Sequence, residues 1–466
     1  MNYGVTIKKG AKPWQIFAQQ NGFSTITLQG TYRRILLSAE LPLQFTEIDS
    51  GAVTVKARIA REDSGESVLP WTVCTLQGEN EWTVTFRVPA GGLYRIETYM
   101  EYEGWSGLSV TRGDMVHNIG VGDIFVIAGQ SNAAGRAKGP VTDMPSLAVH
   151  VLRTSGVWEL ATHPLGETTD AIHIGHFENH NPGHSPWLHF AKRLAQERGY
   201  PIGLVPCAYG GAPLRWWNPN ENGALFTNML AMLGDYAILP RGVLWIQGEA
   251  EGYENSGADY LARFTAFVNA VRLQFGAEVP FITAQINRCV MESTEALDRA
   301  WGMVREAQRK AMVTIPALAT VPTNDLNLYD FIHNSAEANL VVGERCARAA
   351  LALCYGKEID WKAPDLLTLR RSAPDALLGT CRRIRNWLNP FDVPAAQLPF
   401  NAEDENGLAN VKAYSTGNDC LTLVFDRALT GNVRLHGAWR MNTGGVIPCD
   451  CMRLPMLSFY DVALTQ

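Results

Sequence analysis

The sequence predicts an α/β protein: a central three-layer α/β/α domain with a parallel sheet, flanked by β-rich, sandwich-like regions. Short β-branched runs alternate with turn residues before residue 118. Between about residues 120 and 355, short apolar strands alternate with amphipathic helices, and strand-like runs return afterwards. We therefore predict an N-terminal β-sandwich at 1–118, the α/β domain at 119–357 and a β-rich domain at 358–466. Packing of this last domain against the first is left open.

The strands of each region can be named from their composition. The N-terminal region contains the runs STITLQG, GAVTVKARIA, EWTVTFRVPAGG and LYRIETYM, and the C-terminal region contains CLTLVFD and NVRLHGAW. The central region supplies DIFVIAG, PIGLVPCA, GVLWIQG, PFITAQIN and ALATVPT as buried strands. Two helices are well marked between them. One follows Ser185 and ends at Gly199, and the other carries an apolar face from Phe264 and ends at Gly276.

Composition restricts the partners of this chain of 466 residues. Its net charge of −6 gives no field that would attract nucleic acid. No run approaches the ~18 apolar residues that a membrane span needs, and no signal core follows the N-terminal basic residues. We therefore expect a cytoplasmic protein, although a secreted chain trimmed of its signal would look the same. The nine cysteines lack paired spacing, which favours buried thiols in a reducing compartment.

The segment VIAGQSNAAG places a hydroxyl at the end of the first central strand. Open parallel sheets bind ligands at this edge, so Ser131 has the position of an exposed nucleophile. A helix that starts just after Ser131 would point free backbone N–H groups toward a developing negative charge. The plainer alternative is that Ser131 only caps this helix.

The segment LYDFIHNSAEAN supplies an acid and a base at the other end of the region. Asp330 and His333 lie three residues apart, and Asn334 with Glu337 resembles a capping box that starts a helix. His333 would then lie in the loop before that helix, at the same edge of the sheet. An imidazole there can take the proton of Ser131, and Asp330 can fix its tautomer. Taken alone, an Asp and a His at this spacing are often ordinary surface residues.

Two further strand ends meet this edge. YGGAPLRWW follows one strand, and its Gly210 and Gly211 let backbone N–H groups approach a substrate oxygen without a Cβ in the way. GVLWIQG brings the amide donor of Gln247. A hydroxyl, backbone donors, an amide and an Asp–His pair are together the groups that acyl transfer through an oxyanion requires.

These blocks, in this order, resemble the SGNH (GDSL-like) hydrolases. GQSN at Ser131, the paired glycines followed by tryptophan, QGE at Gln247 and D-x-x-H at Asp330 are most similar to the sialate O-acetylesterases and related acetylxylan esterases. The resemblance covers roughly residues 118–350. It implies a serine esterase that removes acetyl groups from carbohydrate hydroxyls and needs no cofactor or metal. An acetylxylan esterase or another small-acyl esterase remains an alternative, as does a carbohydrate-binding protein without catalysis.

The resemblance also implies roles for individual residues. Ser131 would be the nucleophile, His333 the general base and acid, and Asp330 its orienting partner. The oxyanion hole would comprise the backbone of Ser131, that of Gly210 or Gly211, and the side chain of Gln247. Residues expected to support these groups or to line the pocket are Gln130, Asn132, Glu249, Trp216 and Trp217. Ala133 and Ala212 stand where the family usually has methionine and threonine.

Five histidines between Ile172 and His189 raise the alternative of a metal site. They are His173, His176, His180, His184 and His189. Imidazole is a common metal ligand, but no carboxylate at a fixed helical spacing accompanies them. We therefore predict no metal here and expect a loop over a polar pocket. For the tryptophan pair, a platform for a sugar ring competes with plain packing of at least one ring.

Overall fold

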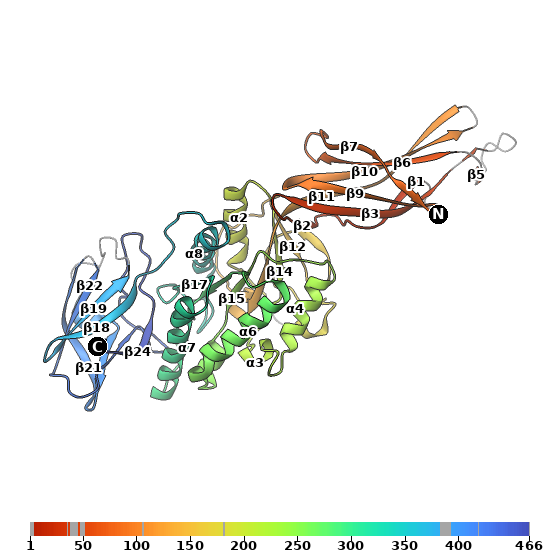
Figure 1. The fold of residues 1–466 in the computed structure, drawn as a ribbon. Helices are drawn as coiled ribbons and strands as arrows, with labels where there is room; N and C mark the ends of the chain where they lie inside the picture. Colours follow the sequence, from red (N-terminus) through yellow and green to blue (C-terminus); the bar gives the residue numbers. More distant parts are fainter. Residues whose placement is uncertain are drawn as a thin grey trace. The chain divides into compact units, whose positions relative to one another are not determined.

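The computed structural model describes residues 4–34, 36–37, 45–46, 52–104, 107–179, 182–382, 393–417 and 419–465, which form a mixed α/β structure (Figure 1). The chain divides into two compact units. The first comprises Met1–Ile124, Pro145–Ala161 and Leu194–Leu204, and the second comprises Phe125–Met144, Thr162–Arg193 and Val205–Gln466. The boundaries predicted at residues 118 and 357 stay a prediction, because compactness divides the chain at other points.

Two antiparallel ladders dominate the first unit. One has the order β1 (Gly4–Lys9), β3 (Phe23–Arg33), β9 (Glu81–Pro89) and β8 (Thr75–Gln77). The other has the order β11 (Gly107–Gly129), β10 (Gly91–Gly104), β6 (Val53–Arg61) and β7 (Ser67–Val73), with β2 (Ile16–Ala18) parallel to β11. Strand residues alternate between buried and exposed, so both ladders contribute to one apolar core that includes Leu28, Trp82, Ile59 and Ile96.

Five shorter strands complete this part of the chain. β12 (Val149–Leu152) pairs in parallel with β14 (Ile202–Pro206) and antiparallel with β13 (Trp158–Leu160). β4 (Leu36–Leu37) pairs with β5 (Phe45–Thr46). The central strand run PIGLVPCA predicted from sequence is thus confirmed as β14.

A parallel sheet lies in the second unit. The end of β11 pairs in parallel with β15 (Gly242–Ile246), followed by β16 (Phe281–Ala284) and β17 (Leu318–Val321). Every residue of β15, β16 and β17 is buried, as expected for strands covered on both faces. The carboxyl ends of these strands therefore meet at one edge.

Helices connect these strands along the chain (Figure 1). They are α1 (Ser131–Ala134), α2 (Trp187–Arg198), α3 (Leu214–Trp217), α4 (Ala224–Gly234), α5 (Glu249–Tyr253), α6 (Tyr260–Phe275), α7 (Glu295–Thr314) and α8 (Ala336–Tyr355), with 3₁₀ turns η1 (Ile174–His176), η2 (Gly257–Asp259) and η3 (Ala395–Gln397). α2 and α6 confirm the two helices predicted from apolar spacing. α7 and α8 both pack against β17.

The C-terminal residues of the second unit form an antiparallel ladder. Its order is β18 (Asp365–Ala373), β19 (Ala376–Arg382), β22 (Cys420–Phe425), β21 (Gly407–Thr416), β20 (Phe400–Asp404), β23 (Arg434–Gly437) and β24 (Phe459–Ala463). Leu377, Leu423 and Leu435 are in its buried core. β24 packs against α7, so this ladder lies on the parallel-sheet part of the second unit.

Arg305 of α7 anchors the ladder. Its side chain is fully buried, and its guanidinium donates to the carbonyl oxygens of Ile286 at 3.1 Å, Ala438 at 3.1 Å and Arg440 at 2.6 Å. Burial lowers the pKa of Arg305 to about 9, so the group remains protonated at neutral pH. The guanidinium of Arg305 thus donates hydrogen bonds both to the segment after β16 and to the residues that follow β23 in the C-terminal ladder.

Two further observations concern the cysteines and the helices. The nine cysteines, all of them among the described residues, form no disulfide, and those from Cys74 to Cys381 are buried. Among the described residues, no helix combines the length and the apolar character that crossing a membrane requires.

Replacement of Arg305 by methionine should lower the free energy of unfolding by about 3 kcal/mol or more. Methionine has similar length but no donors, and each buried carbonyl left without a partner costs ~1–3 kcal/mol. Urea denaturation would measure the change. Lys310→Met is a matched control on the same helix, because Lys310 is largely exposed and its ion pair with Glu306 contributes little. Equal midpoints for both variants would contradict the anchoring role.

Candidate active site

Ser131 lies where β11 ends and α1 begins. Gly129, the last residue of β11, has a φ of 123°, and a Cβ there would lie 2.2 Å from the carbonyl oxygen of Ile246. Only glycine lets β11 end this close to β15. Gln130 is the N-cap of α1, and no side chain caps the helix. The alternative in which Ser131 merely caps the helix is therefore wrong, and its half-buried hydroxyl is left available.

His333 lies in the loop that precedes α8. Asp330 accepts hydrogen bonds from the His333 side chain, Nδ1 to Oδ2 at 2.7 Å, and from the His333 backbone N–H at 2.7 Å. Burial alone would raise the pKa of Asp330, but these hydrogen bonds and one from Ile332 hold it below its ordinary value. An ionised Asp330 fixes the proton of the imidazole on Nδ1, so Nε2 is the basic nitrogen.

The cap of α8 differs from the sequence prediction. Ser335, and not Asn334, is the N-cap, and its Oγ accepts a hydrogen bond from the Ala338 N–H at 3.2 Å. Asn334 is buried, and its side chain forms hydrogen bonds with two other segments instead. Its side chain accepts from Asn287 at 2.8 Å and donates to Asn339 at 3.2 Å. Asn334, the residue after His333, is thus held by Asn287, which follows β16, and by Asn339 of α8.

Asn132 joins the two halves of the site. Its Nδ2 donates to the carbonyl oxygen of Ile332 at 3.4 Å, and its Oδ1 accepts from the backbone N–H of Asn334 at 3.1 Å. The residue after Ser131 therefore bonds to both chain neighbours of His333, across about 200 positions of sequence. The hydroxyl of Ser131 makes no direct hydrogen bond with the imidazole, and such contacts often tighten only when substrate binds.

Glu249 and Gln130 hold α5 against this turn. Glu249 is 1% exposed, and its Oε1 accepts from Asn132 Nδ2 at 2.8 Å. Burial raises the pKa of Glu249, and the hydrogen bond from Asn132 offsets part of this effect. The Oε1 atom of Gln130 accepts from the backbone N–H groups of Gly248 at 3.3 Å and Ala250 at 3.4 Å. Both side chains thus connect the nucleophile turn to the QGE block.

Three of the candidate oxyanion donors, those of Gly210, Gly211 and Gln247, are not equivalent. The N–H of Gly210 donates to Glu178 Oε1 at 2.8 Å, whereas the N–H of Gly211 makes no hydrogen bond within the described part of the chain. Gln247 is fully buried, and its Nε2 already donates to the carbonyl oxygen of Ala212 at 3.2 Å and to Glu251. Its Oε1 is buried without a partner among the described residues.

The two tryptophans of the glycine loop have different environments. Trp217 is fully buried and packs edge-on against Trp245, with ring centroids 5.5 Å apart. Trp216 is half-buried and forms an edge contact with Tyr209 at 5.8 Å. Only Trp216 is open to a ligand. Ala133 and Ala212, where the family usually has larger residues, are both fully buried.

The five histidines do not converge on one point among the described residues. His173 bonds to Asp235 at 2.9 Å, and His189 lies 3.8 Å from Glu344. His176 is buried, which lowers its pKa to about 4, while His180 lies outside the described residues. His184 alone joins a group with metal-ligand spacing.

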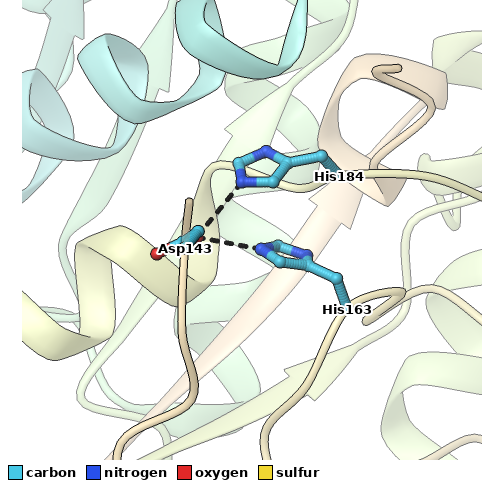
Figure 2. Close-up of side chains that lie close together, drawn as sticks. All are labelled: Asp143, His163 and His184. Atoms are coloured by element: carbon cyan, nitrogen blue, oxygen red, sulfur yellow. Dashed lines mark hydrogen bonds and ion pairs between the residues drawn. The ribbon is translucent and has the colours of Figure 1, made fainter. Parts of the chain in front are cut away.

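That group consists of Asp143, His163 and His184 (Figure 2). Nε2 of His163 lies 2.9 Å from Asp143 Oδ2, and Nε2 of His184 lies 3.2 Å from the same oxygen. Nδ1 of His163 accepts from the Ser185 N–H at 3.3 Å, so its proton is on Nε2, where a metal would bind. The ammonium of Lys192 also bonds to Asp143. These contacts fit a hydrogen-bonded ion cluster better than a metal site.

Several residues of the site carried no signal in a single sequence. Asn287 is the last residue of the run PFITAQIN, so its place after a strand was foreseeable, but its contact with Asn334 was not. Arg136 and Glu178 form a buried ion pair at 2.7 Å although 42 positions separate them. Covariation in an alignment would be the signal for such pairs.

Known proteins resemble this chain in sequence and in fold. Residues 121–352 match the profile of a family described as carbohydrate esterase, sialic acid-specific acetylesterase. A carbohydrate acetylesterase from Xanthomonas citri, XAC1771, aligns over 98% of this chain and 99% of its own, with 19% identity and a TM-score of 0.64. An Arabidopsis thaliana protein, AT4G34215, aligns over 49% of this chain and 98% of its own, with 24% identity and a TM-score of 0.42. No curated protein sequence matches the chain.

The Xanthomonas structure shows that the fold is shared along nearly the whole chain. The family match covers β15, β16 and β17 with every candidate catalytic residue from Ser131 to His333. As its four sequence blocks indicate, the segment of residues 121–352 belongs to the SGNH-related carbohydrate esterases.

Proposed function

We propose that the protein is a carbohydrate O-acetylesterase in which Ser131 is the nucleophile, His333 the general base and acid, and Asp330 the residue that orients the imidazole. The observation that carries the proposal is the pair of hydrogen bonds from Asn132 to both neighbours of His333. This contact supports a shared reaction centre for two residues that are remote in sequence.

The reaction follows from these groups. Nε2 of His333 takes the hydroxyl proton as Ser131 Oγ attacks the acetyl carbonyl carbon, and the resulting imidazolium is stabilised by Asp330. The same proton then passes to the sugar oxygen as the ester bond breaks, which leaves an acetyl group on Ser131. His333 then takes a proton from water, which attacks this acyl-enzyme, and the imidazolium returns that proton to Ser131 Oγ as acetate leaves. Proton and acyl group balance without a cofactor.

We propose that the backbone N–H groups of Ser131 and Gly211 stabilise the oxyanion. The N–H of Gly210 already has Glu178 as its acceptor, which supports Gly211 as the second donor. Gln247 could contribute a third only if its amide turned by 180°, since its nitrogen now donates elsewhere. Losing one donor of this kind typically costs about 3–4 kcal/mol of barrier.

The family description supports a sialate ester as substrate, and a 9-O-acetyl group is our first candidate. The printed name of the Xanthomonas structure supports the wider class of acetylated carbohydrates. Acetylxylan and other small-acyl esters are the competing substrates. Trp216 and Tyr209 offer half-buried aromatic rings beside the glycine loop, which suits a sugar ring.

The first test is hydrolysis of 4-nitrophenyl esters. The wild type should release nitrophenol from the acetate faster than from the butyrate or octanoate, and Ser131→Ala should lower kcat by at least about 10³-fold because no acyl-enzyme can form. Acetylated sialic acid and acetylxylan, assayed for released acetate, then separate the substrates. Equal rates for wild type and Ser131→Ala would leave a carbohydrate-binding protein as the better reading.

Asn132→Ala should lower kcat by about 10²-fold with little change in KM. The loop of His333 loses both hydrogen bonds to the nucleophile turn, and misplacement of a catalytic group by ~1 Å can cost this factor. Steady-state kinetics on 4-nitrophenyl acetate would measure it. Asn220→Ala, on the exposed segment between α3 and α4, is the control and should match the wild type. An unchanged kcat for Asn132→Ala would contradict the bridging role.

Turnover should fall as the solution is acidified. Because the pKa of Asp330 lies below its ordinary value, Asp330 stays ionised in mild acid, and the loss reflects protonation of the imidazole. Asp330→Asn should lower kcat by roughly 10²- to 10⁴-fold, since an amide can stabilise the wrong tautomer. A pH–rate profile that is flat from acid to neutral pH would refute His333 as the base.

A further inference from the structure

A buried ion pair lies directly against the glycine loop. Glu178 Oε2 accepts from Arg136 Nη2 at 2.7 Å, and Glu178 Oε1 accepts from the Gly210 N–H at 2.8 Å. The side chains of Arg136 and Glu178 are 6% and 0% exposed. A Cβ on Gly210 would lie 2.5 Å from Glu178 Oε1 and 3.3 Å from Arg136 Nη2, so only glycine lets the pair approach this closely.

The pair connects two segments that each supply a proposed oxyanion donor. Arg136 follows α1, the helix that begins with Ser131, and comes directly after its C-cap Gly135. Glu178 lies in the loop after η1 and contacts Gly210. The chain of contacts thus runs from the Ser131 helix through Arg136 and Glu178 to the Gly210–Gly211 turn.

The negative charge of Glu178 would also affect the proposed oxyanion. A carboxylate beside an oxyanion hole repels the negative charge that develops on the substrate oxygen, and burial weakens the screening of that repulsion. Arg136 balances the charge of Glu178 within hydrogen-bond distance. The Arg136 guanidinium therefore allows an anionic acceptor to hold Gly210 without a net negative field at the reaction centre.

We propose that Arg136 and Glu178 are positioning residues of the oxyanion hole: Glu178 holds the N–H of Gly210 so that the N–H of Gly211 faces the substrate oxygen, and Arg136 neutralises Glu178. This inference rests on the proposed esterase function. A pair with a purely structural role would support folding but would not act selectively on the transition state.

The test uses the full-length chain and the steady-state hydrolysis of 4-nitrophenyl acetate. Arg136→Met leaves the buried carboxylate without its cation and should lower kcat by about 10²-fold, with KM within about threefold of the wild type. The double variant Arg136→Met, Glu178→Gln removes both charges but keeps an acceptor for Gly210. It should recover at least about tenfold of the lost kcat.

A second pair of variants covers the case in which Arg136→Met fails to fold. Glu178→Gln keeps an acceptor for the N–H of Gly210, whereas Glu178→Leu has a similar size and no acceptor. The glutamine variant should keep kcat within about tenfold of the wild type, and the leucine variant should fall by about 10²-fold. Circular dichroism and thermal unfolding would confirm that the compared variants are folded.

The outcomes separate this inference from the proposed function. A double variant that is no faster than Arg136→Met, or equal kcat values for Glu178→Gln and Glu178→Leu, overturns the inference while a Ser131-dependent wild type upholds the esterase. A rise of KM with unchanged kcat overturns it as well. If the wild type itself shows no Ser131-dependent hydrolysis, the proposed function fails, and the inference fails with it.

Discussion

The candidate active site depends on the side-chain amide of Asn132. An amide presents a donor and an acceptor on adjacent atoms, which lets one residue bond to a carbonyl on one side of His333 and an N–H on the other. A carboxylate could accept but not donate, and an alanine could do neither. Because Asn132 follows Ser131 directly, its two hydrogen bonds link the turn that contains Ser131 to the loop that contains His333. The buried carboxyl group of Glu249 in turn orients the Asn132 amide, because its Oε1 accepts a hydrogen bond from Asn132 Nδ2.

Neutral donors and balanced acids surround the reactive groups. Glu178 has Arg136 as its cation, and Glu251 accepts from the backbone N–H of Leu214 and from Gln247. Burial raises the pKa of Glu251 and of Glu249, so a proton on either acid costs less there than in water. The proposed oxyanion would be destabilised by any unbalanced negative charge close to it. The acids therefore serve as acceptors that hold loops, and not as free charges that face the substrate.

The sequence predicted the parts that local pattern determines. Buried strands, amphipathic α2 and α6, the position of Ser131 after a strand and that of His333 in the loop before α8 all follow from apolar spacing, capping and turn residues. The sequence prediction failed where two neighbouring residues have a similar tendency to cap a helix. Asn334 and Ser335 can both cap α8, but the Asn334 side chain bonds to Asn287, and Ser335 is the N-cap. The sequence was silent on Arg136 and Glu178, because a pair formed across loops leaves no periodic signal.

Hydrogen bonds link the C-terminal residues to the loop that contains His333. The segment after β16 bonds to the ladder through the Cys289 N–H and the carbonyl oxygen of Met441, at 3.0 Å. The next residue, Val290, donates to Phe331 at 2.9 Å, within the loop that holds His333. Arg305 bonds to the same segment, because its Nε donates to the carbonyl oxygen of Ile286 at 3.1 Å. Hydrogen bonds thus connect the β-rich C-terminal residues, through the segment after β16, with the loop that contains His333.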